Sequence, residues 1–367
     1  MMHSTTFRKP SLHLVVLILV MTSGVVMRFW NAFEIPLTYD EYSSLYRAQV
    51  AGFQEVLDQG ILTDAHPAFT NTFLYVWLKV AHTPFLIKLP FLLLSCMALW
   101  LTYINGRNWL GPRAGLLGAA LLSVGEFPLM YSQIARPYSV GLFSVVFSMW
   151  ALHRFLHDSR WSKAVVLGIA LAFGAYVHHF LALIGLVLAG YAAYAKWRSL
   201  RSLIPVLVTG IVLYFPQLLI TLHQLGHKGI GTVISTPDIP WLAHHFSYIG
   251  NHDLLWKVCL LFLLGITISK WKLVNRRHLL VFLTIWLAPL FVGWTYSVAV
   301  APVLQDRVLI FGLPALFVVI AAGMDYLKPH LAYATILIIT CLGIYSTAAN
   351  RDYYALFYAN PFSGVVA

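Results

Sequence analysis

Long apolar runs separated by short polar stretches recur along nearly the whole chain. A bilayer core about 30 Å thick needs about 20 residues of helix, and inside lipid only helices and closed barrels satisfy the backbone. Barrel strands would alternate polar and apolar residues, which these runs do not. The pattern therefore predicts an all-α polytopic membrane protein. Its spans are expected at residues 11–30, 85–104, 113–131, 137–156, 163–178, 180–197, 203–223, 253–269, 278–299, 308–325 and 331–349.

The polar stretches between these runs predict the orientation. Segment 67–81 is apolar but short, so it either crosses the membrane or lies along its surface. If it lies along the surface, the chain has eleven spans, and the basic loops fall on the same side as Arg8 and Lys9. That side then holds 15 of the 24 Lys and Arg residues but only two of the 13 acids. Because basic loops stay in the cytoplasm, we expect eleven spans with the N-terminus cytoplasmic.

Two long loops are then expected on the extracytoplasmic side, at residues 31–83 and 224–252. The first contains two amphipathic segments, 41–57 and 67–81, of the kind that lies in the headgroup plane. The second is rich in Gly, Pro and His and has little helical periodicity. The expected organisation is one integral membrane domain over residues 1–367, without a soluble C-terminal domain.

Composition supports the membrane class and excludes others. Hydrophobic residues make up 60% of the chain and charged residues 10%, too few charges for the surface of a soluble domain. The net charge of +11 comes from short loops that anchor spans, so no nucleic-acid partner is expected. Cys96, Cys259 and Cys341 all lie in apolar runs, which indicates packing rather than a disulfide or zinc framework.

The adjacent acids Asp40 and Glu41 are the first candidates for chemistry. Only 13 of the 367 residues are acidic, and eleven of these lie at or beyond the outer membrane edge. Two acids side by side at this edge, followed by His66 and by Arg136 beyond another apolar run, indicate a catalytic site facing the extracytoplasmic water. The alternative is that both acids only solvate an interfacial helix and favour its N-terminus through the helix dipole.

Several short motifs occur in a characteristic order along the chain. They are Asp40-Glu41, His66-Pro67, L-I-K-L-P at 86–90, G-R-N-W-L-G-P-R-A-G at 106–115, Y-S-Q-I-A-R-P-Y-S at 131–139, Y-V-H-H-F at 176–180 and D-R-V-L at 306–309. This ordered set resembles the GT-C glycosyltransferases of the protein O-mannosyltransferase and lipid A aminoarabinose transferase type, over about residues 25–325. Two departures are Lys88, where these enzymes usually have Arg, and His66-Pro67, which lacks a second Pro.

The resemblance implies an enzyme that moves a monosaccharide from a polyprenyl-phosphate donor to a hydroxyl of a glycan, lipid or protein acceptor. It implies transfer on the extracytoplasmic side of a membrane, here expected to be a bacterial inner membrane. Asp40 is the expected base, with inversion at the anomeric carbon. No general acid is needed, since the phosphate leaves as a stable anion. Glu41 is expected to orient the acceptor or to help hold a divalent cation.

Donor binding is assigned to six further residues. Arg136 and Arg307, at the outer ends of spans, can form bidentate bonds to phosphate. The other four are Lys88 for phosphate, and His66, Tyr138 and His178 for sugar or phosphate. Each has a simpler alternative: Lys88 can reach lipid headgroups, Tyr138 can be an interfacial belt residue, and His178 can belong to a polar turn.

Other functions and sites were weighed against this interpretation. The i, i+4 pair His223 and His227 suits a metal, but no acidic or cysteine ligand joins it at a recognisable spacing, so no protein metal site is expected. A transporter or flippase of lipid-linked saccharides is the main alternative function. It would show repeated halves and broken helices near mid-bilayer, and the sequence has no obvious repeat. A membrane acyl or phosphate-group transferase would need a different constellation of nucleophile and base.

Overall fold

The computed structural model describes residues 11–226 and 234–359, and all regular structure within them is helical. Seven helical stretches in this part of the chain are long and apolar enough to cross a membrane, or nine if two bent pairs each form one span. The predicted all-α membrane class is therefore confirmed. The number of eleven spans remains a prediction. The seven stretches are Leu12–Glu34, Pro84–Trp109, Pro137–His157, Trp197–Gly226, Arg276–Ala299, Asp306–Tyr326 and Pro329–Asn350.

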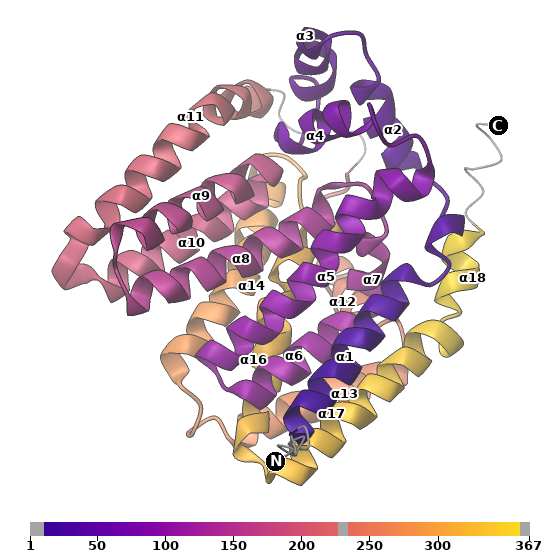
Figure 1. The fold of residues 1–367 in the computed structure, drawn as a ribbon, viewed down its shortest axis with the longest axis vertical. Coiled ribbons are helices and arrows are strands. Elements are labelled where there is room, and N and C mark those ends of the chain that lie inside the picture. Colours follow the sequence, from indigo (N-terminus) through magenta and orange to yellow (C-terminus); the bar gives the residue numbers. More distant parts are fainter. Residues whose placement is uncertain (1–10, 227–233, 360–367) are drawn as a thin grey trace, which may run out of the picture.

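Figure 1 shows the arrangement of the helices that form these stretches. They are α1 (Leu12–Phe29), α5 (Pro84–Trp109), α8 (Pro137–His157), α11 (Ile204–Gly226), α14 (Arg276–Ala299), α16 (Leu313–Ala321) and α17 (Pro329–Ile344). Two further apolar helices, α9 (Trp161–Val177) and α10 (His179–Ala195), have 17 residues each. The remaining short elements are η1 (Ala32–Glu34), η3 (Trp197–Leu203), α15 (Asp306–Leu309), η4 (Ile310–Gly312), η5 (Ala322–Tyr326), η6 (Tyr345–Asn350) and α18 (Tyr353–Tyr358).

The centre of the bundle is α6 (Pro112–Val124), which contacts α1, α5, α16 and α17. Every residue of this helix from Ala114 to Val124 is buried. A Cβ added at Gly115 would lie 2.4 Å from the Tyr103 carbonyl oxygen of α5. Small residues allow such close helix approach, which is how helices gain packing energy inside a membrane.

The predicted span 113–131 is bent by 66° between α6 and α7 (Glu126–Ser132). Pro128 lacks the N–H that would bond to the Val124 carbonyl, and its ring crowds that carbonyl. The hydroxyl of Thr347 donates to the Val124 oxygen instead, at 2.7 Å. The Val124 carbonyl oxygen therefore keeps a hydrogen-bond partner at the bend.

The first predicted outer loop forms a cap of short helices at one end of the bundle (Figure 1). These are α2 (Tyr39–Ala48), α3 (Phe53–Glu55), η2 (Val56–Ile61) and α4 (Phe69–Trp77). The expectation of one helix over 41–57 was wrong, because the chain leaves the helix after Ala48 and restarts after Gly52. α4 has only 9 residues, far fewer than a bilayer crossing needs.

The second predicted outer loop also contains a helix that was not expected, α12 (Ile239–Ile249). Asp238 caps it by accepting from the Trp241 N–H at 2.7 Å, and Pro240 lies in its first turn. α12 precedes α13 (Leu254–Ser269) at a bend of 88°. His227, Arg8 and Lys9, which entered the sequence interpretation, lie outside the described residues.

Candidate active site

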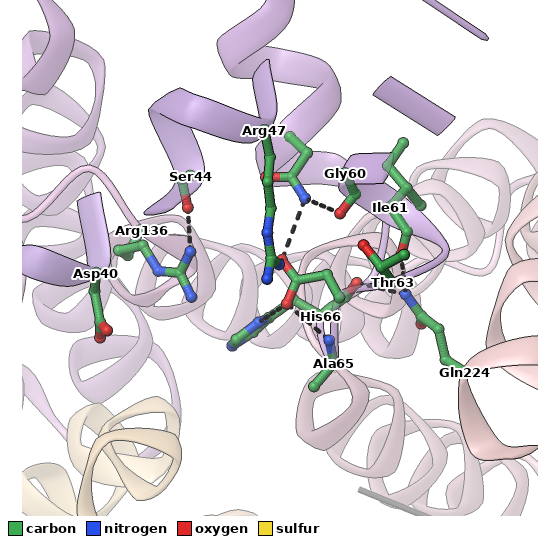
Figure 2. Close-up of polar contacts among 12 residues, drawn as sticks. Asp40, Ser44, Arg47, Gly60, Ile61, Thr63, Ala65, His66, Arg136 and Gln224 are labelled. Carbon is green, nitrogen blue, oxygen red and sulfur yellow. Dashed lines mark hydrogen bonds and ion pairs between the residues drawn. The ribbon is translucent and has the colours of Figure 1, made fainter. Parts of the chain in front are cut away.

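Asp40, Ser44 and Arg47 lie on one face of α2, at positions i, i+4 and i+7. Figure 2 shows Ser44 in contact with Arg136, with Asp40 on one side of Arg136 in this view and Arg47 on the other. The helix starts in a capping box: Thr38 accepts from the Glu41 N–H, and the Glu41 carboxylate accepts from the Thr38 N–H at 2.8 Å. Two reciprocal bonds therefore fix the backbone that carries Asp40.

Asp40 forms an ion pair with Arg307, which comes from α15, 267 positions along the chain. One guanidinium nitrogen lies 2.5 Å from a carboxylate oxygen. The Asp40 side chain is 41% exposed and that of Arg307 30% exposed, so ligands can reach both. Arg307 also donates to the side-chain oxygen of Gln305. The predicted base and one predicted phosphate ligand thus lie in direct contact.

Arg136 is buried at the start of α8, where it donates to the hydroxyl of Ser44. Within the described residues its Nε has no hydrogen-bond partner, and no carboxylate forms an ion pair with it. A buried cation without a paired anion is costly. The arrangement therefore suits an anionic ligand, as the sequence predicted for Arg136.

Glu41 and Lys88 form a fully buried ion pair, 3.0 Å apart and both 0% exposed at the side chain. Lys88 also donates to the carbonyl oxygens of Pro36 at 2.8 Å and Gln133 at 2.9 Å. Glu41 accepts from the Ala135 N–H at 2.6 Å, one residue before Arg136. The three donors of Lys88 are therefore all used, and the Glu41 oxygens all face protein donors. This pair joins the segments that carry Asp40 and Arg136.

His66, His178 and Arg307 line a cavity of about 300 Å³. The remaining lining side chains are mostly apolar, among them Phe180, Leu183, Val292, Val303 and Val308. The predicted ligand Tyr138 does not line it. Its ring is buried and packs edge-on against Tyr131 at 4.6 Å. Asp40 and Arg136 do not line the cavity either, but Arg307 does, and through its ion pair it connects the cavity to Asp40.

The sequence interpretation missed Asp64, a buried acid two residues before His66. It accepts from His66 Nδ1 at 3.0 Å, from Arg47 at 3.0 Å and from Asn71 at 3.2 Å. Burial opposes ionisation of Asp64, but His66, Arg136 and Arg47 outweigh it and hold the pKa of this carboxyl below its usual value. An acid two residues before a His, in a chain with so few acids, is the signal that could have revealed it.

His178 lies between α9 and α10 and caps α10, where its Nδ1 accepts from the Phe180 N–H at 3.2 Å. Its ring is 5.3 Å from that of His66. Burial holds the pKa of His178 well below its usual value, and nearby His66 adds to this effect. The imidazole is therefore neutral at physiological pH.

The described residues hold no group of three or more His, Cys, Asp or Glu side chains that could bind a metal ion. Near the site, the Glu41 carboxylate already accepts from Thr38, Lys88 and Ala135. Asp40 faces Arg307 instead of a second acid. A divalent cation bound by Asp40 and Glu41 together would have to displace these contacts.

Part of the sequence matches a known protein family, and most of the chain matches solved structures. Residues 65–220 match the family model of dolichyl-phosphate-mannose-protein mannosyltransferases. This region contains five of the predicted site residues, namely His66, Lys88, Arg136, Tyr138 and His178. No curated protein matches the sequence.

Solved structures of two glycosyltransferases share the fold. ArnT from Cupriavidus metallidurans, bound to undecaprenyl phosphate, matches with a TM-score of 0.57 and 15% identity over 89% of this chain and 62% of ArnT. The oligosaccharyltransferase of Archaeoglobus fulgidus, tethered to an acceptor peptide, matches with a TM-score of 0.55 and 14% identity over 96% of this chain and 55% of its own. The protein thus has the GT-C fold, and the resemblance predicted from its sequence is confirmed. The chain spans less than two thirds of the length of either structure.

Proposed function

We propose that this protein is a membrane glycosyltransferase that moves a monosaccharide from a polyprenyl-phosphate donor to an acceptor hydroxyl. The observation that carries the proposal is the contact between Asp40 and Arg307 at a cavity with a mostly apolar lining. A carboxylate suits deprotonation of a hydroxyl, and a guanidinium suits binding of a phosphate. Two similar structures support this class of donor. ArnT was solved with bound undecaprenyl phosphate. AglB of Archaeoglobus fulgidus was solved with an inhibitory peptide and a dolichol-phosphate, and it matches with a TM-score of 0.50 and 14% identity over 95% of this chain and 55% of AglB.

In the proposed reaction the acceptor oxygen attacks the anomeric carbon while Asp40 takes its proton. The bond between the anomeric carbon and the phosphate oxygen breaks, and the phosphate leaves with the electron pair. Arg136 and Arg307 hold the departing anion, which already carries stable negative charge. Attack on the face opposite the phosphate inverts the anomeric centre. His66 and His178 contact the sugar.

We assign Glu41 and Lys88 a positioning role in place of acceptor binding and phosphate binding. Their contacts tie the start of α2 to the segment before α8. Loss of either partner would shift Asp40 and Arg136 relative to each other. Under this assignment a divalent cation is not needed for transfer, since arginines supply the positive charge at the phosphate.

The eleven-span topology is part of the proposal. Seven long stretches, two bent pairs and the two 17-residue helices α9 and α10 account for it. Seventeen residues is the lower limit for a crossing. The cap of α2, α3, η2 and α4 then lies on the extracytoplasmic side of a bacterial inner membrane, with the N-terminus cytoplasmic. The acceptor, a glycan, lipid or protein, approaches from that side.

The test is transfer by the purified protein in detergent or nanodiscs, with undecaprenyl-phosphate sugars as donors and envelope lipids, glycans and peptides as acceptors. Asp40→Asn is expected to lower the transfer rate by at least 100-fold, within the range of a lost general base. Binding of undecaprenyl phosphate should persist, because the arginines remain. Transfer at the unsubstituted rate by Asp40→Asn would remove Asp40 as the base.

A further inference from the structure

The two histidines of the cavity have fixed and opposite tautomers. His66 Nδ1 lies 3.0 Å from an Asp64 oxygen. An ionised carboxylate can only accept, so Nδ1 carries a proton, and the neutral form of the ring keeps a lone pair on Nε2. His178 Nδ1 accepts from the Phe180 N–H, so its proton lies on Nε2. His66 therefore presents an acceptor at Nε2, and His178 presents a donor.

Asp64 is held firmly in the orientation that sets the His66 tautomer. It accepts from the Ala65 N–H at 2.7 Å on the oxygen that faces His66. Its other oxygen accepts from Arg47 at 3.0 Å and from Asn71 at 3.2 Å. Figure 2 shows Arg47 reaching down from α2 into this cluster. The carboxylate therefore cannot turn without breaking contacts to three segments of the chain.

The two imidazoles lie together at the cavity, with ring centroids 5.3 Å apart and planes at 73°. Both line the cavity, as does Arg307, the proposed phosphate ligand. Each Nδ1 is occupied, so Nε2 is the nitrogen left for a ligand on each ring. A sugar hydroxyl both donates and accepts, and two neighbouring hydroxyls match one acceptor and one donor.

We propose that His66 and His178 recognise neighbouring free hydroxyls of the donor monosaccharide, and that Asp64 is the positioning residue that keeps His66 an acceptor. This deepens the proposed function and rests on it. The preferred donor is then a polyprenyl-phosphate hexose or pentose with two adjacent unsubstituted hydroxyls. Asp64 itself does not touch the sugar.

Asn and Gln substitutions test the roles of the two ring nitrogens one at a time. An Asn amide reaches about as far as Nδ1, and a Gln amide about as far as Nε2. His66→Asn keeps a partner for Asp64 but removes the group facing the sugar, whereas His66→Gln keeps an acceptor there. His178→Asn retains the cap on Phe180, because Asn is a favoured N-cap residue, and removes the Nε2 donor. His82→Asn, at an exposed histidine away from the cavity, is the matched control.

The assay compares binding of undecaprenyl phosphate with binding of undecaprenyl phosphate carrying mannose, glucose or galactose. The unsubstituted protein is expected to bind at least one glycosylated lipid more tightly than the bare lipid. His66→Asn and His178→Asn should each weaken that binding about fivefold, as for one lost hydrogen bond. Binding of the bare lipid should stay unchanged, His66→Gln should recover most of the loss, and His82→Asn should behave as the unsubstituted protein.

The Asp64→Asn variant tests the positioning role of Asp64 through the tautomer of His66, which would not change if Asp64 only stabilised the fold. In ¹⁵N-histidine NMR spectra the unsubstituted protein should show His66 as the Nδ1–H tautomer, and Asp64→Asn should show a mixture, with weaker binding of the glycosylated lipid. Equal binding of that lipid by His66→Asn, His178→Asn and the unsubstituted protein would overturn the inference while leaving the proposed function intact. Failure of the unsubstituted protein to bind any of the four lipids would overturn the proposed function itself.

Discussion

Replacement of Lys88 by Met decides between two roles for a residue that the sequence suggested as a phosphate ligand. Lys88 is 0% exposed, and its ammonium donates to Glu41, to Pro36 and to Gln133 at 2.8–3.0 Å. Met has a similar length but no charge. The substitution therefore leaves the Glu41 carboxylate buried without its cation, and two carbonyl oxygens without a donor.

The expected cost is large. Removal of one partner of a buried ion pair destabilises proteins by about 3–5 kcal/mol, because the remaining charge stays buried. Because Glu41 still accepts hydrogen bonds from Thr38 and Ala135, we expect the loss of stability to fall within that range and not above it. Lys79→Met is the matched control. Lys79 is exposed over the Tyr75 ring at 4.6 Å, and such contacts contribute about 0.5–1 kcal/mol.

The assay is reversible unfolding in mixed micelles, measured alongside undecaprenyl phosphate binding. Lys88→Met should lower the free energy of unfolding by about 3–5 kcal/mol. The double variant with Glu41→Gln should lose less than the sum of the single losses, since no uncompensated charge remains. Unchanged stability of Lys88→Met together with weaker lipid binding would refute the reasoning and restore Lys88 as a phosphate ligand.

Three further predictions concern the phosphate, the core and the topology. Arg307→Lys should weaken binding of undecaprenyl phosphate about tenfold, because Lys lacks the bidentate fork, and equal affinity by calorimetry would exclude the assigned contact. Gly115→Ala should destabilise the bundle by about 1–3 kcal/mol through overpacking against α5, whereas Gly190→Ala, with open space around it, should be neutral in the same unfolding assay. Single cysteines at positions 46 and 272, in a background without native cysteines, should react with an impermeant thiol reagent from opposite sides of the membrane, and labelling from the same side would contradict the proposed orientation.

Hydrophobic patterning predicted the helices well because lipid imposes a simple rule on sequence. The expected span 253–269 corresponds to α13 (Leu254–Ser269), and 137–156 to α8 (Pro137–His157). The same pattern did not predict the bend after α6. The apolar run continues to Gly125, whose extended backbone separates α6 from α7, and the signals for the bend are Gly125 itself, the charged Glu126 and Pro128. Apolar periodicity reports burial in lipid or protein, whereas bends depend on single backbone groups.

The sequence also contained a signal for the role of Glu41 that the catalytic hypothesis obscured. Thr38 and Glu41 form the T-x-x-E pattern of a capping box, and the structure contains that box. Two adjacent acids therefore have different environments: Asp40, at N2, points toward Arg307 and solvent, whereas Glu41, at N3, turns back to the cap. One residue along a helix is a rotation of about 100°, which is enough to give two adjacent carboxylates different surroundings.

The long-range partners are what a single sequence leaves undetermined. Lys88 lies 47 positions from Glu41, and Arg307 lies 267 positions from Asp40, so no local rule pairs them. Because charges are scarce, few cations are available to Asp40 and Glu41, but the sequence does not say which cation pairs with which acid. In the structure Glu41 pairs with Lys88, which contacts only protein groups, and Asp40 pairs with Arg307, which lines the cavity. Under the proposed function, the exposed pair is the one that donor and acceptor reach, and the buried pair holds that geometry.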